Sequence, residues 1–148
     1  MDKLNEKHTQ LLRAISTLNT TLTIFEKVKR GQTCCATHKD QEEEYRIHRD
    51  SVIQRFEYCI DLLWKHLKKY LERAHLTSEP TIPTEIVRRT CAEKIITEAE
   101  AESILELIKS RNKTSHIYVE EIAEHLVKLI PAYYDVMLCI AKKLAVNS

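Results

Sequence analysis

Glycine and proline are scarce in this chain, and that scarcity limits the folds open to it. The 148 residues include one glycine, Gly31, and three prolines, Pro80, Pro83 and Pro131. A β-rich fold of this length needs many tight turns, and such turns draw on glycine, proline and asparagine. We therefore expect an all-α protein with a few long helices. The length suits one core, so we predict that residues 1–148 form a single domain.

Apolar residues recur at spacings of three, four and seven along most of the chain, which is the pattern of helices with one buried face. The spacing predicts helices over residues 2–29, 41–74, 83–93, 98–110 and 120–144. This order indicates an up-and-down four-helix bundle with an additional short helix. Gly31 is expected to end the first helix, and Thr97 with Glu100 has the spacing of a capping box. Pro131 is expected to kink or split the last helix.

The second predicted helix is the longest, and its two halves differ in character. Its first ten residues, QEEEYRIHRD, are expected to be a solvated charged stretch. Its remainder carries a wide apolar face, formed by Val52, Phe56, Ile60, Leu63, Trp64 and Leu67. We expect that face to exceed what one short bundle covers, and we therefore predict a homodimer.

Charge and cysteine content favour a cytoplasmic protein without a membrane partner. The formal net charge is +1, from 23 basic and 22 acidic residues, whereas binding duplex DNA through many phosphates favours a marked basic excess. No apolar run approaches the roughly 20 residues of a membrane span, and the first residues, MDKLNEKHTQLL, are charged. The cysteine count is five, an odd number, which favours reduced thiols.

Several side chains that could bind a ligand have simpler interpretations. One glycine cannot supply a glycine-rich phosphate loop, so P-loop and Rossmann sites are excluded. Cys34, Cys35 and His38 lie together but lack a second pair of zinc ligands, so we expect neither a metal nor a cofactor. The lone histidines His66, His75 and His125 stand among polar residues and are expected to be solvated. The aromatic residues Tyr58, Trp64 and Tyr70 are expected to pack in the core or an interface.

Residues 110–118, SRNKTSHIY, carry the chemistry of most interest. On one continuous helix, Arg111 and His116 would point roughly 140° apart, so they converge only if the helix breaks or two chains contribute. The intervening Asn, Thr and Ser residues favour such a break. Arginine stabilises charge on phosphate oxygens and histidine moves protons near pH 7, a workable pair for phosphodiester chemistry. The simpler interpretation is that polar residues collect at a helix junction.

Two long blocks of the sequence resemble a known family. RDSVIQRFEYCIDLLWKHLKKYLE, residues 49–72, and the stretch at 81–130 that includes SRNKTSH are similar to the nucleotidyltransferase substrate-binding protein-like family of the HEPN superfamily. The likeness extends over about residues 3–140. It implies a helical bundle that commonly pairs as a homodimer and that works beside a nucleotidyltransferase of the MNT type, encoded as a separate chain.

The resemblance also assigns roles to residues. Ribonuclease members of the superfamily cut RNA without a metal, using an arginine, the polar residue directly after it and a histidine four positions further on. In this chain these residues are Arg111, Asn112 and His116. In toxin members, the partner enzyme silences the toxin by transferring AMP to a tyrosine two residues after the histidine, which is Tyr118. This chain lacks the glycine–serine and paired-aspartate signature of a nucleotidyltransferase.

Two functions are therefore open from the sequence. The first is a toxin of a toxin–antitoxin pair, a metal-independent ribonuclease inhibited by AMPylation. The second is a non-catalytic substrate-binding or regulatory subunit of a two-chain nucleotidyltransferase. The complete Arg–His–Tyr set favours the toxin, because a pure binding subunit has no evident need for it.

Overall fold

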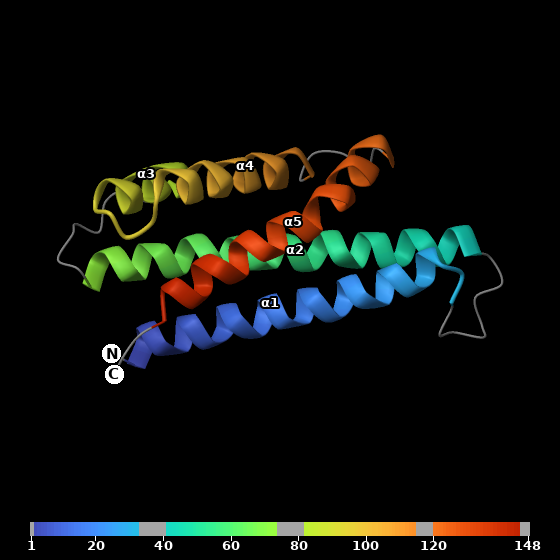
Figure 1. The fold of residues 1–148 in the computed structure, drawn as a ribbon, viewed down its shortest axis with the longest axis horizontal. Coiled ribbons are helices and arrows are strands. Elements are labelled where there is room, and N and C mark those ends of the chain that lie inside the picture. Colours follow the sequence, from blue (N-terminus) through green and yellow to red (C-terminus); the bar gives the residue numbers. More distant parts are fainter. Residues whose placement is uncertain (1, 33–40, 74–81, 115–119, 146–148) are drawn as a thin grey trace.

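The computed structural model describes residues 2–32, 41–73, 82–114 and 120–145. These residues form five helices: α1 (Asp2–Lys29), α2 (Gln41–Arg73), α3 (Pro83–Ala92), α4 (Glu98–Thr114) and α5 (Glu120–Lys143). No strand occurs within them, so the all-α prediction is confirmed. Helices α1, α2, α4 and α5 alternate in direction, the short α3 precedes α4, and both termini lie at one end of the bundle (Figure 1).

The end of α1 confirms the role expected of the glycine. Gly31 has a φ of +78°, in the left-handed region that glycine enters without strain. Its N–H donates to the carbonyl of Val28 at 2.9 Å, and the N–H of Gln32 donates to the carbonyl of Lys27 at 2.9 Å. These two bonds form a Schellman motif, which satisfies the last carbonyls of the helix.

Helix α3 ends in the same way without a glycine. Lys94 has a φ of 61°, and its N–H donates to the carbonyl of Cys91 at 2.9 Å. The N–H of Ile95 donates to the carbonyl of Thr90 at 3.1 Å, which completes a second Schellman motif. A residue with a Cβ in this conformation stores backbone strain.

The predicted helix starts are also present. Pro83 occupies the first turn of α3, where its missing N–H costs nothing. At the start of α4, the N–H of Thr97 donates to the Glu100 carboxylate at 2.8 Å, and the N–H of Glu100 donates to the Thr97 hydroxyl at 3.1 Å. This is the capping box. Lys143 donates to the same carboxylate at 2.6 Å, which ties the start of α4 to the end of α5.

The central helix is α2, which contacts every other helix. The apolar face assigned to an interface between two copies lies instead inside the chain. Its most deeply buried members, each at most 2% exposed, are Val52, Phe56, Ile60, Leu63 and Leu67. The argument made for a homodimer is therefore wrong, because other helices of the same chain cover most of this face and leave only Trp64 partly buried, and the homodimer itself stays a prediction.

Two further expectations need correction. The stretch QEEEYRIHRD is not simply solvated, because Glu44 and Arg49 are buried within it. His66 is fully buried rather than solvated. Pro131 lies inside α5, which continues on both sides of it, so the helix is not split, and the kink stays a prediction. No helix within the described ranges is long and apolar enough to cross a membrane.

His66 packs at the end of the bundle where the termini meet. Its ring centroid lies 5.3 Å from that of His8, and His8 Nε2 lies 2.8 Å from the carbonyl oxygen of Ala141 on α5. Burial lowers the pKa of His66 to about 4, assisted by the nearby His8 and opposed by the backbone of Leu144. The imidazole is therefore neutral in the folded protein near neutral pH.

Candidate functional site

Arg111 and Asn112 lie in the last turn of α4, which continues to Thr114, beyond the end at residue 110 that the sequence predicted. The Arg111 side chain is 29% exposed, and its Nη2 lies 3.5 Å from Oδ2 of Asp61 on α2. Asn112 is exposed. The ion pair fixes the guanidinium at the edge where α4 packs on α2, and it leaves part of the side chain open to solvent.

The partners of this arginine in the sequence motif fall in a part of the chain that is not described. His116 and Tyr118 both belong to residues 115–119, between α4 and α5. The convergence of Arg111 with His116 therefore stays a prediction. Cys34, Cys35 and His38 also lie outside the described residues, and among those that are described no three metal-binding side chains cluster.

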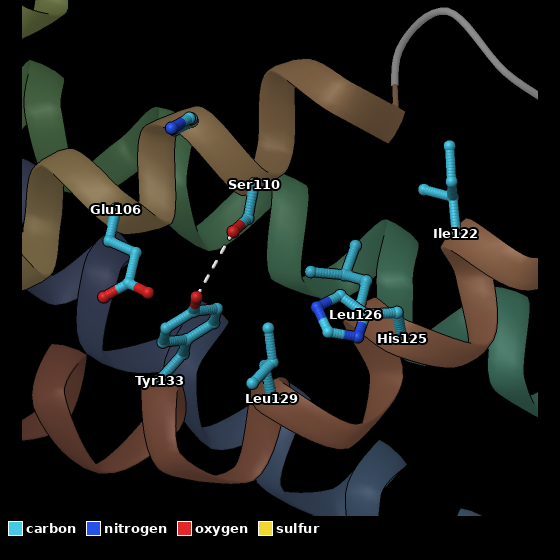
Figure 2. Close-up of a pocket in the computed structure, with 8 residues that line it drawn as sticks. Glu106, Ser110, Ile122, His125, Leu126, Leu129 and Tyr133 are labelled. Carbon is cyan, nitrogen blue, oxygen red and sulfur yellow. Dashed lines mark hydrogen bonds between the residues drawn. The ribbon is translucent and has the colours of Figure 1, made fainter.

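A surface pocket of about 170 Å³ opens between α4 and α5, beside the last turn of α4. Its lining comprises Glu106, Lys109, Ser110, Ile122, His125, Leu126, Leu129 and Tyr133. The Ser110 hydroxyl and the Tyr133 hydroxyl, both in this lining, are hydrogen-bonded to each other at 3.2 Å (Figure 2). His125 is exposed, as the sequence predicted. The pocket thus combines an aliphatic wall with hydroxyl, imidazole, amine and carboxylate groups, and Ser110 in its lining directly precedes Arg111 in the sequence.

A buried arginine holds the start of α5. Arg49 is only 4% exposed, and its Nη1 donates to Glu120 at 2.5 Å and to Glu124 at 3.1 Å. Arg49 Nε also donates to Asp50 at 3.0 Å. The hydroxyl of Tyr45 donates to the other oxygen of Glu124 at 2.8 Å. The network therefore joins the first turns of α2 to the first turn of α5, which begins immediately after residues 115–119.

The charges of this network perturb its members in the expected directions. The hydrogen bond from Arg49 lowers the pKa of Glu120. Burial, together with the hydrogen bond to Glu124, raises the pKa of Tyr45 to about 12. These shifts favour a charged Glu120 carboxylate and a protonated Tyr45 phenol.

Sequence reasoning missed Asp61 and the Arg49 network. Asp61 stands fifty positions before Arg111, and no local spacing links them. The acidic residues Glu120 and Glu124 have helical i, i+4 spacing, which places both on one face of α5, and that was the one available signal. Their buried arginine partner lies on another helix.

Three solved structures have folds similar to that of this chain. A structure from Thermus thermophilus has 25% sequence identity and a TM-score of 0.70, and the match covers 92% of this chain and 99% of that one. The tri-AMPylated HEPN toxin of Shewanella oneidensis, solved in complex with MNT antitoxin, has 16% identity and a TM-score of 0.61, covering 89% and 96%. YutE, a cytosolic protein of unknown function from Bacillus subtilis, has 16% identity and a TM-score of 0.62, covering 92% and 86%.

At these identities the last two likenesses concern the fold alone. Among curated proteins, none matches the sequence significantly. The family model for nucleotidyltransferase substrate binding protein like proteins matches residues 6–146. Because that match spans nearly the whole chain, the protein belongs to the nucleotidyltransferase substrate binding protein-like family, and its fold is similar to that of the Shewanella oneidensis protein.

Proposed function

We propose that this protein is a toxin-type, metal-independent endoribonuclease that a separate nucleotidyltransferase of the MNT type silences by AMP transfer. The observation that carries the proposal is Arg111. It belongs to the Arg–Asn–x3–His sequence, and its side chain, which is 29% exposed, forms an ion pair with Asp61 from the last turn of α4. The family membership and the fold shared with a HEPN toxin support the same function.

The proposed reaction needs one cation and one titratable group. The 2′-hydroxyl attacks the adjacent phosphorus, a new O2′–P bond forms, and the P–O5′ bond breaks, which yields a cyclic phosphate and a 5′-hydroxyl end. His116 acts as base or acid, since imidazole exchanges protons near pH 7. Arg111 stabilises the added charge on the phosphate oxygens, and Asn112 orients the phosphate or the imidazole. Two such sets, one from each copy, would face each other in a homodimer.

Control would act at Tyr118, two residues after His116. Each AMP adds a phosphodiester charge near Arg111, where it competes with the RNA phosphate for the guanidinium. The adenosine group blocks the same space sterically. Intact mass after co-expression with the partner enzyme should show added AMP units on the wild type and none on Tyr118→Phe.

The ribonuclease is tested by expressing the chain alone. Growth should arrest, and Arg111→Ala or His116→Ala should relieve the arrest and abolish RNA cleavage by the purified protein, with helical circular dichroism unchanged. Arg88→Ala is a matched control, because Arg88 is an exposed arginine on α3 with an ion pair of its own. A purified wild type that cuts no RNA would contradict the ribonuclease.

The second candidate is a non-catalytic subunit that presents substrate to the nucleotidyltransferase. The pocket between α4 and α5 favours it, because the pocket offers both polar and aliphatic contacts. In that case RNA stays intact, while the partner enzyme loses activity when this chain is withheld. The two candidates therefore differ in whether this chain alone acts on RNA.

A further inference from the structure

Tyr58 is an aromatic residue that the fold leaves uncovered. It lies in the middle of α2, where the nearby Phe56 and Cys59 are fully buried, yet it is 52% exposed. The sequence had suggested that it packs in the core or an interface, and the structure shows that the core does not use it. A tyrosine ring held at the surface by a rigid, long helix is a preformed face for a planar ligand.

Charged side chains flank this ring along the same surface. Arg55 is exposed three residues before Tyr58, and Asp61 stands three residues after it. Residues three apart on a helix are neighbours, with Cβ atoms about 5–6 Å apart. Asp61 in turn holds Nη2 of Arg111 at 3.5 Å. By helix spacing, Arg55 and Asp61 are therefore each neighbours of Tyr58, and the ion pair of Asp61 places Arg111 on the Asp61 side of the ring.

We propose that Tyr58 is a stacking platform for an unpaired RNA base beside the scissile phosphate, with Arg55 binding a neighbouring phosphate. This inference rests on the proposed function, because it takes Arg111 as the group that meets the reacting phosphate. Every base has a face that stacks on an aromatic ring, and cationic side chains beside the ring match the charge of the strand. The whole chain is nearly neutral, so this local arrangement supplies the attraction that net charge does not.

The chemistry selects single strands. A base within a duplex is already stacked on both faces and cannot reach the Tyr58 ring, so an unpaired segment is required. Exposed aliphatic residues elsewhere, such as Ile82 before α3, offer apolar surface without an aromatic face. Ile82 therefore serves as a matched control for loss of exposed apolar surface.

The test is fluorescence anisotropy of the full-length protein with a labelled 2′-O-methyl RNA strand, which cannot be cleaved through its 2′-oxygen. Tyr58→Phe keeps the ring and should bind as the wild type does. Tyr58→Leu should raise the Kd about tenfold, the scale of one lost base–aromatic stack. Arg55→Gln should reduce the slope of log K against log salt by about 0.7, the value for one phosphate contact on a single strand. Ile82→Ala should change neither quantity.

Several results would overturn the inference. They are no binding of the strand by the wild type, the same Kd for Tyr58→Leu as for the wild type, or the same Kd for the RNA as a duplex and as a single strand. Light scattering is measured on each variant as well, because a lower mass for Tyr58→Leu would assign the ring to an interface between two copies instead.

The two proposals fail separately in this design. Binding that follows the Tyr58 pattern, with native RNA left uncut, removes the ribonuclease and keeps the stacking site. Cleavage of native RNA together with unchanged binding by Tyr58→Leu removes the stacking site and keeps the ribonuclease.

Discussion

Replacing Arg49 with methionine should destabilise the protein markedly, because this residue is a buried cation on which two helices depend. Its guanidinium is 4% exposed and donates to Glu120 and Glu124 of α5 and to Asp50 of α2. Methionine keeps most of the aliphatic stem, so the change removes charge and hydrogen bonds while leaving little cavity.

The magnitude depends on which groups are left buried without a partner. Removing one member of a fully buried ion pair costs about 3–5 kcal/mol, because the other charge is stranded. Here the carboxylates regain water, since the side chain of Glu120 is 63% exposed and that of Glu124 is 35% exposed. We therefore expect a loss of about 2 kcal/mol, less than the fully buried case and more than a surface pair. For a chain of this length, Tm should fall by roughly 4–8 °C.

Urea unfolding followed by circular dichroism measures the loss directly. Arg46→Met is the matched control, because Arg46 forms an exposed i, i+4 pair with Glu42 at 2.7 Å, a geometry worth less than about 0.5 kcal/mol. A double-mutant cycle of Arg49→Met with Glu124→Gln should give a coupling of about 1 kcal/mol. If Arg49→Met costs no more than Arg46→Met, the network does not hold α5, and the reasoning is refuted.

Two further predictions concern stability. The folded pKa of His66, about 4, lies below its unfolded value of about 6.5, so the unfolded chain binds the proton first as pH falls. The free energy of unfolding should drop by about 3 kcal/mol as the pH falls from 6.5 to 4, and the contribution of the neutral His66 should be fully present above pH 6.5. In urea titrations at different pH, His66→Leu should remove this dependence of the unfolding free energy on pH. The control His125→Gln, at an exposed position, should keep it. An equal dependence in His66→Leu and in the wild type would count against the buried imidazole. Lys94→Gly should relieve the strain of the positive φ at the end of α3 and raise the free energy of unfolding by about 1 kcal/mol. Gly31→Ala should lower that free energy by a similar amount. A lower stability of Lys94→Gly would contradict the strain at Lys94.

Helix positions were predictable because local rules place them. The first helix was expected over residues 2–29 and is Asp2–Lys29, since its apolar period ends just before Gly31. The start of α4 followed from Thr97 and Glu100, whose reciprocal bonds are set within four residues. Its end was missed by four residues, because the Asn, Thr and Ser residues that follow Arg111 were interpreted as helix-breaking. An ion pair to another helix supports that extra turn.

Burial of polar residues was less predictable, although part of the signal was present. His66 has lysines around it in the sequence, which suggested solvent. Its position, however, is three residues after Leu63 and seven after Cys59, both fully buried, so helical period alone points it inward. For His66, the position on the helix therefore predicts burial more reliably than the polar character of histidine predicts exposure. Arg49 differs, because its burial requires carboxylates that lie some seventy residues further along the chain.

In the candidate site, too, the residues set by local sequence were predictable and those set by long-range contacts were not. Arg111 and Asn112 were found because a motif is a local pattern, and the residues that give Arg111 its position were not. Asp61 and Tyr58 share one face of α2, and only the packing of α4 across that helix brings Arg111 to the same surface. A substitution at Asp61 should therefore disturb the site while leaving the motif intact. Asp61→Asn would keep the size of the side chain and remove the charge that competes with phosphate for the guanidinium, so it should alter RNA affinity without unfolding the bundle.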